Sequence, residues 1–73
     1  MIEPQLAVTI ALGLRRGATP AGVSTDGEGY VVDFRHDGDS SSNLSVYVDG
    51  TTGEAHTVSA GEYRRLSPHL HPL

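Results

Sequence analysis

The fold is decided by two stretches in the middle of the chain, GYVVDFRH at residues 29–36 and NLSVYVD at residues 43–49. In both stretches apolar and polar side chains alternate with a period of two, which is typical of a strand with one buried face and one wet face. The expected inward-facing residues are Tyr30, Val32, Phe34, Leu44, Val46 and Val48. The expected outward-facing residues are Val31, Asp33, Arg35, Ser45, Tyr47 and Asp49.

Turn signals separate these two strands from their neighbours. The segments DGEG at 26–29, DGDSSS at 37–42 and DGTTG at 49–53 are rich in glycine, aspartate, serine and threonine. They predict antiparallel hairpins, because parallel strands need much longer crossover connections. We also expect a weak strand around Val23, after a linker, and a last strand over residues 54–59.

The N-terminal segment, residues 2–16, fits two patterns. Every even position from 2 to 14 is apolar, which is a strand pattern. Helical i, i+4 spacing is also present, at Ile2, Leu6, Ile10 and Leu14. The ends favour a helix over residues 4–16, because Pro4 suits a first turn and Gly17 after two arginines suits a C-terminus.

Together these elements predict an α+β fold, with an N-terminal helix packed on a three- to four-stranded antiparallel meander sheet. The chain has 73 residues, which is enough for one small domain. We place this domain at residues 1–66, with a short helical turn at 60–66. We expect residues 67–73 to form a flexible C-terminal tail.

Negative charge gathers in the middle of the chain. The net charge is −4, and residues 26–54 hold seven carboxylates against Arg35 alone. An acidic body argues against nucleic-acid binding, in which phosphate neutralisation supplies most of the affinity. It suits a partner protein with a basic surface, although the same charge also serves solubility.

No stretch indicates a membrane span or an export signal. The longest apolar stretch, Leu6–Leu14, is far shorter than the ~20 residues that a span requires. A secretory signal carries positive charge before its apolar run, whereas here Glu3 precedes the run and arginines follow it. We therefore expect a cytoplasmic protein without membrane contact, either complete or a fragment of a longer chain.

No arrangement of residues predicts catalysis. The chain has no cysteine, no glycine-rich loop before a helix and no obvious acid–base pair, so we expect no enzyme activity and no cofactor. A metal site would need His36 and His56 to converge with Asp37, and no spacing requires this. Weak metal or ligand binding by histidines, including the pair His69 and His71, is one alternative function.

The remaining functional signal lies on the surface. Val31 and Tyr47 are expected on the wet face of the sheet, and Val8 and Leu12 lie off the core stripe of the helix. Apolar residues exposed on two faces indicate docking sites, although single exposed apolar residues are common. The candidate partner-binding residues are Val8, Leu12, Val31, Asp33, Arg35, Tyr47 and Asp49.

The order of these elements resembles the PepSY family. The resemblance rests on a helix containing IAL at 10–12, on GYVV at 29–32 and on the hairpin VYVDGTTGE at 46–54. The hairpin is also similar to one in small α+β toxin-immunity proteins. Both resemblances imply a non-catalytic protein-binding module, and PepSY modules are usually exported and often act as inhibitory pro-segments of proteases.

These observations favour a small protein that binds or inhibits another protein through an acidic sheet and loop surface. A second alternative is a structural protein that forms a homodimer or larger homo-oligomer. In that case Val8 and Leu12, or an open strand edge, would pair with a second copy.

Overall fold

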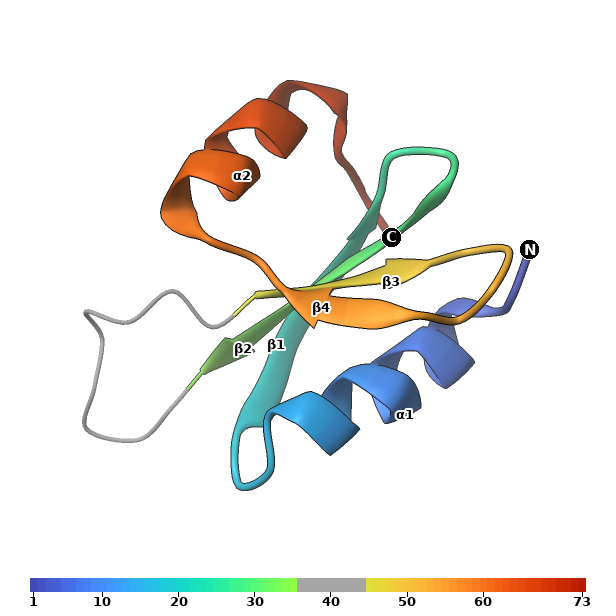
Figure 1. Cartoon of the computed structure of the whole chain (residues 1–73), viewed down its shortest axis with the longest axis vertical. Helices are drawn as coiled ribbons and strands as arrows, with labels where there is room; N and C mark the ends of the chain where they lie inside the picture. Colours follow the sequence, from blue (N-terminus) through green and yellow to red (C-terminus); the bar gives the residue numbers. More distant parts are fainter. Residues whose placement is uncertain (36–44) are drawn as a thin grey trace.

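The computed structural model describes residues 1–35 and 45–73 (Figure 1). The elements in chain order are α1 (Pro4–Leu14), β1 (Thr19–Thr25), β2 (Gly29–Arg35), β3 (Val46–Asp49), β4 (Ala55–Thr57), α2 (Ala60–Leu66), the 3-10 helix η1 (Ser67–His69) and β5 (His71–Pro72). The strands form one antiparallel sheet in the order β4-β3-β2-β1-β5. The expected α+β fold, with an N-terminal helix on an antiparallel meander, is confirmed.

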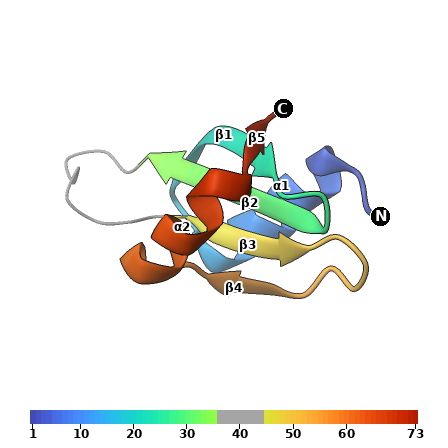
Figure 2. The same ribbon diagram turned by 90° about the horizontal axis from the view of Figure 1, so that it is seen from above.

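The sheet is covered on both faces (Figure 2). α1 lies against one face, where it contacts β1 to β4, whereas α2 and η1 lie over the other face. The central strands are therefore buried from both sides. Four side chains of β2 and β3 have no exposed surface: Val31, Val32, Val46 and Val48.

The expectation that Val31 faces water is wrong. Val31 pairs with Ser24 of β1 and Tyr47 of β3, so it lies in the middle of the second face of the sheet. The C-terminal helical segment covers that face, and the exposed fraction of Val31 is 0%. A central strand with valine on both faces needs cover on both, because wet apolar surface loses the free energy of burial.

The C-terminal residues are ordered, and the flexible tail expected at residues 67–73 is wrong. η1 continues α2, and β5 then pairs antiparallel with the end of β1, placing Pro72 opposite Ser24 and His71 opposite Thr25. The N–H of Leu73 donates to the carbonyl of Val23 at 3.0 Å. These contacts add a fifth strand to the three or four expected, and they anchor the end of the chain at a sheet edge.

Several element boundaries differ from expectation. β1 begins at Thr19, inside the expected linker, and β4 is shorter than the expected strand 54–59 because Ser59 already caps α2. The short helix at 60–66 is confirmed. The expected turn at 37–42, together with His36 and Leu44, lies outside the described residues.

The helix expected at the N-terminus is confirmed, but it packs on the sheet by a different stripe. Ala7 and Ala11 are fully buried, whereas the exposed fractions of Leu6 and Leu14 are 48% and 46%. The two alanines let the helix backbone come close to the sheet, and the closely packed contact leaves no room for larger side chains at these two positions. The expected core stripe through Leu6 and Leu14 is therefore wrong at both leucines.

Two residues of α1 were expected to lie off the core stripe. Leu12 does, with an exposed fraction of 36%, so that expectation is confirmed. Val8 does not, because it is half-buried and packs against the core as Ile10 does. No helix in the described ranges is long and apolar enough to cross a membrane.

We expect the close approach of α1 to be sensitive to side-chain volume at Ala11. Substitution Ala11→Leu should lower the free energy of unfolding by about 1–3 kcal/mol, because the added carbons must displace packed atoms. The matched control is Gly13→Ala, where a new Cβ meets no atom within 4 Å. The control should raise the free energy of unfolding by up to about 1 kcal/mol. Urea denaturation of the two variants measures both effects, and an unchanged midpoint for Ala11→Leu would contradict this packing.

Candidate functional site

Asp26 and the expected binding residue Asp49 are engaged in their own turns. Oδ1 of Asp26 accepts hydrogen bonds from the N–H groups of Glu28 and Gly29, each at 2.8 Å. Oδ1 of Asp49 accepts from the N–H groups of Thr51 and Thr52, at 2.8 and 3.0 Å. These side chains stabilise the two hairpin turns, and this accounts locally for the aspartate at the start of each turn.

The same contacts hold both carboxyl groups in their charged form. Burial acts to raise the pKa of Asp26, but the hydrogen bonds from Glu28 and Gly29 outweigh it, so the pKa lies below its usual value. The N–H groups of Thr52 and Thr51 lower the pKa of Asp49. Both groups are charged at neutral pH, and neither has the raised pKa that general-acid catalysis at neutral pH requires.

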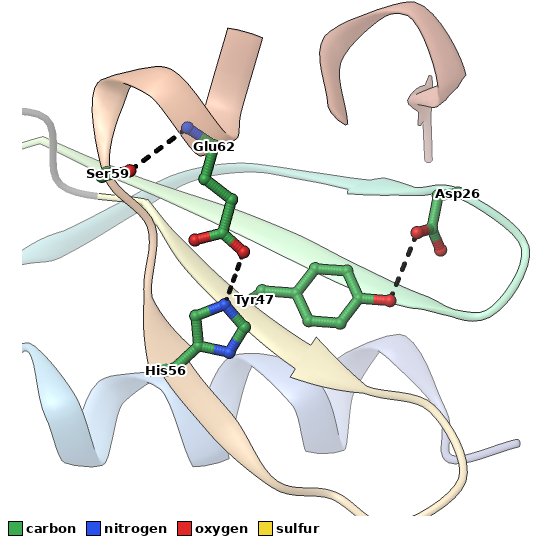
Figure 3. Close-up of polar contacts among 5 residues, drawn as sticks. All are labelled: Asp26, Tyr47, His56, Ser59 and Glu62. Atoms are coloured by element: carbon green, nitrogen blue, oxygen red, sulfur yellow. Dashed lines mark hydrogen bonds and ion pairs between the residues drawn. The ribbon is translucent and has the colours of Figure 1, made fainter. Parts of the chain in front are cut away.

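Tyr47 lies on the second face of the sheet, and its ring points along the face toward Asp26 (Figure 3). Its hydroxyl donates to Oδ2 of Asp26 at 3.2 Å. A Cβ at Gly29 would lie 2.7 Å from Cζ of Tyr47, so only glycine leaves room for the ring there. Burial, followed by the negative charge of Asp26 and the hydrogen bond to it, raises the pKa of Tyr47 to about 12.

His56 of β4 connects the sheet to α2. Its ring lies next to Tyr47 with the ring centroids 5.6 Å apart, and its Nε2 donates to Oε2 of Glu62 at 2.7 Å. Ser59 caps the start of α2 by accepting from the N–H of Glu62 at 3.2 Å. Figure 3 shows these contacts as a row of polar side chains running from Asp26 to Ser59.

Asp33 also makes contacts within the molecule. Oδ1 of Asp33 accepts a hydrogen bond from the buried Ser45 hydroxyl at 2.6 Å. The Tyr63 hydroxyl of α2 also donates to Asp33; burial, and then the charge of Asp33, raises the pKa of Tyr63. Asp33 therefore helps to hold α2 on the sheet, and of the expected binding residues on this face only Arg35 is exposed.

The expected docking face of the sheet is thus occupied by the protein's own C-terminal segment. This corrects the expectation of a wet sheet face, because its centre, Val31, is buried. The described residues hold no group of three or more His, Asp or Glu that could hold a metal ion. His69 and His71 lie in separate elements, η1 and β5, and the expected partners His36 and Asp37 lie outside the described residues.

The outer face of α1 is a different kind of surface. The sequence of the helix, PQLAVTIALGL, contains no charged residue, and no acidic or basic side chain lies in its first or last turn. Leu6 and Leu12 are exposed there, and Leu14 is exposed at the last residue of the helix. The outer side of a surface helix usually carries charged side chains, whereas the polar residues of α1 are the uncharged Gln5 and Thr9. Of the expected binding residues on α1, Leu12 belongs to this outer face and Val8 to the flank that meets the sheet.

Sequence reasoning missed Leu6 and Leu14 as surface residues because their spacing also fits a core stripe. The signal that could have found them is the lack of charge over the eleven residues of α1. Only part of such a helix can face a sheet, so some of its leucines have to remain outside. We call the outward surface of this helix the α1 face; it is formed by Gln5, Leu6, Thr9, Leu12 and Gly13.

Among residues 1–35 and 45–73, most charges gather at the two ends of the sheet. Hydrogen bonds from Ile2 to Gly50 and from Gly50 to Glu28, at 2.8 and 2.9 Å, gather the N-terminus and both described turns at one end (Figure 1, right). The carboxylates of this acidic end are Glu3, Asp26, Glu28, Asp49 and Glu54. At the opposite end, where α1 and β2 finish, lie three arginines: Arg15, Arg16 and Arg35. We call this the arginine end.

Comparison with known protein families finds no family model that matches the chain. Neither the curated proteins nor the solved structures contain a match. The resemblance to the PepSY family and to toxin-immunity proteins therefore stays a prediction from the sequence.

We expect Tyr47 to be the last tyrosine to ionise. The chain has three tyrosines and no lysine, so above about pH 9 tyrosines are the main groups that titrate before arginine. The neutral hydroxyl is favoured in the folded state, so its contribution to stability is complete below pH 10 and is lost as pH rises toward about 12. Ultraviolet titration of tyrosinate should show one step near pH 12 that Tyr47→Phe removes.

Two matched variants check the cause of this shift. Asp26→Asn removes the charge next to the hydroxyl and should move the last step toward lower pH, whereas Tyr30→Phe should leave that step in place. A titration in which Tyr47→Phe leaves the highest step unchanged would contradict the contact between Tyr47 and Asp26.

Proposed function

We propose that the protein is a non-catalytic module that binds another protein, and that it docks on the α1 face. The observation that carries this proposal is an uncharged helix whose outward leucines, Leu6 and Leu12, are 48% and 36% exposed. Contiguous exposed apolar surface marks protein interaction sites, and the cores of interfaces are depleted of charged residues. The other large face of the sheet is already covered by α2 and η1.

The acidic end supports a partner that carries basic groups beside an apolar surface. Glu3, Glu28 and Glu54 are exposed, and all three lie at the end of the sheet where α1 begins. Complementary charge of this kind speeds association and sets orientation more than it adds affinity. An inhibitory action, a cytoplasmic location and a relationship to PepSY or toxin-immunity proteins are further parts of this proposal. They rest on the sequence patterns.

Metal or ligand binding by the histidines is the weaker candidate. His56 is engaged with Glu62, and no described cluster supplies three ligands. Homo-oligomer formation is the stronger alternative, because the α1 face would serve a second copy as well as it serves a different protein.

A photo-crosslinking amino acid placed at Gln5, in the native cells, tests the proposed function. Gln5 lies on the exposed side of α1, so we expect it to form covalent adducts with the bound protein. The same amino acid placed at Arg64 on α2 is the control and should form few adducts. Leu6→Asp with Leu12→Asp should reduce the adducts at Gln5 about tenfold or more, because central apolar contacts dominate binding. Equal labelling from Gln5 and Arg64, or none from Gln5, would contradict the proposal.

A further inference from the structure

The α1 face has the composition of a helix–helix contact. Leu6 and Leu12 stand on either side of the small residues Thr9 and Gly13. The Thr9 hydroxyl donates to the Gln5 carbonyl at 3.2 Å within the same helix. Its hydrogen bond would therefore be kept if a second protein covered Thr9. A Cβ at Gly13 would meet no atom within 4 Å, so this part of the helix surface is open. Small residues between large ones let a second helix approach closely.

The order of residues along α1 is symmetric about Thr9. Leu6 and Leu12 each lie three positions from Thr9, and Glu3 and Arg15 each lie six positions from it. If two copies of α1 pair antiparallel about a two-fold axis beside Thr9, Leu6 of each copy lies level with Leu12 of the other. A two-fold interface requires a surface that is complementary to itself, and the spacing of the leucines meets this requirement.

The charges at the two ends of α1 favour the same arrangement. Glu3 is exposed and its side chain caps no helix N–H, and Arg16 is exposed beyond the other end of the helix. In the antiparallel pair each Glu3 lies level with Arg15, at the end of the second copy's helix where the exposed Arg16 follows, and the acidic end of one copy lies beside the arginine end of the other. A parallel pair would bring like charges together, so the charge pattern selects the antiparallel pair.

We propose that the partner of the α1 face is the α1 face of a second copy, in an antiparallel pair with two-fold symmetry. This inference rests on the part of the proposed function that makes the α1 face a docking surface, and it assigns that surface to a second copy of the chain. One helix of three turns from each copy makes a small interface. The dimer is therefore weak, with a dissociation constant on the order of 10⁻⁴ M.

Sedimentation equilibrium between about 10 µM and about 1 mM tests this pairing over the expected range of dissociation. The average mass of the wild-type chain should rise from 7.7 kDa toward twice that value as the concentration increases. Leu12→Asp should stay at the monomer mass over the whole range. Far-UV circular dichroism shows whether each variant is folded, and charge variants at Glu3 and Arg16 give a test that does not depend on Leu12.

A charge exchange distinguishes the antiparallel pair from any other contact. Glu3→Arg and Arg16→Glu should each weaken association about fivefold, because each single change creates two like-charge contacts per dimer. The double variant Glu3→Arg with Arg16→Glu should restore association to near the wild-type value. The matched control is Arg64→Glu, the same change of charge on α2, which should alter association by less than about twofold.

Each outcome of these measurements supports or overturns the antiparallel pair. The pair is supported by a wild-type mass that rises with concentration, by a Leu12→Asp variant that stays monomeric, and by a double charge variant that regains the association lost in each single charge variant. A wild-type mass of 7.7 kDa at every concentration overturns the antiparallel pair. It is also overturned if the double charge variant associates more weakly than either single variant, or if Leu12→Asp still dimerises. Crosslinking from Gln5 separates the two proposals, because adducts with a different protein would keep the proposed function while overturning the homodimer.

Discussion

Burial of the central strand on both faces is the constraint on which the rest of the structure depends. β2 carries Val31 on one face and Val32 on the other, and both are fully buried. A chain of 73 residues has little material with which to cover two faces. Each face therefore receives one short helix, and the last residues of the chain complete the sheet by pairing with β1.

The two covers are built in different ways. The backbone of α1 lies close to the sheet at Ala7 and Ala11, which are fully buried. Close packing of these alanines stabilises the contact, and the larger leucines of α1 take no part in it. α2 has no fully buried residue and is held by polar contacts, among them those of Glu62 with His56 and of Tyr63 with Asp33. Polar residues of the sheet, among them His56 and Asp33, make contacts that hold α2, whereas leucines of α1 are exposed. The exposed leucines of α1 form the surface that we propose for binding.

The sequence predicted the strands and turns well because their signals are local. Alternation marks β2 and β3, and Asp26 and Asp49 mark the turns that they cap. The burial of Val31 and the pairing of β5 could not be predicted in this way, because both depend on residues distant in sequence. A seven-residue helix and a two-residue strand are also too short to show periodicity. The core side of α1 was predicted from the i, i+4 spacing of its larger apolar residues, but Ala7 and Ala11 are the residues buried against the sheet.

If the outer side of α1 is the surface left for binding, it should respond to protein concentration while the rest of the molecule does not. Two-dimensional ¹H–¹⁵N NMR spectra recorded over a dilution series measure this response, because every backbone N–H reports on its own surroundings. We expect the concentration-dependent shifts to be confined to residues 3–16, with β4 and α2 unchanged. Shifts centred on β4 or β5 would show instead that a strand edge forms the interface, and would contradict binding through α1.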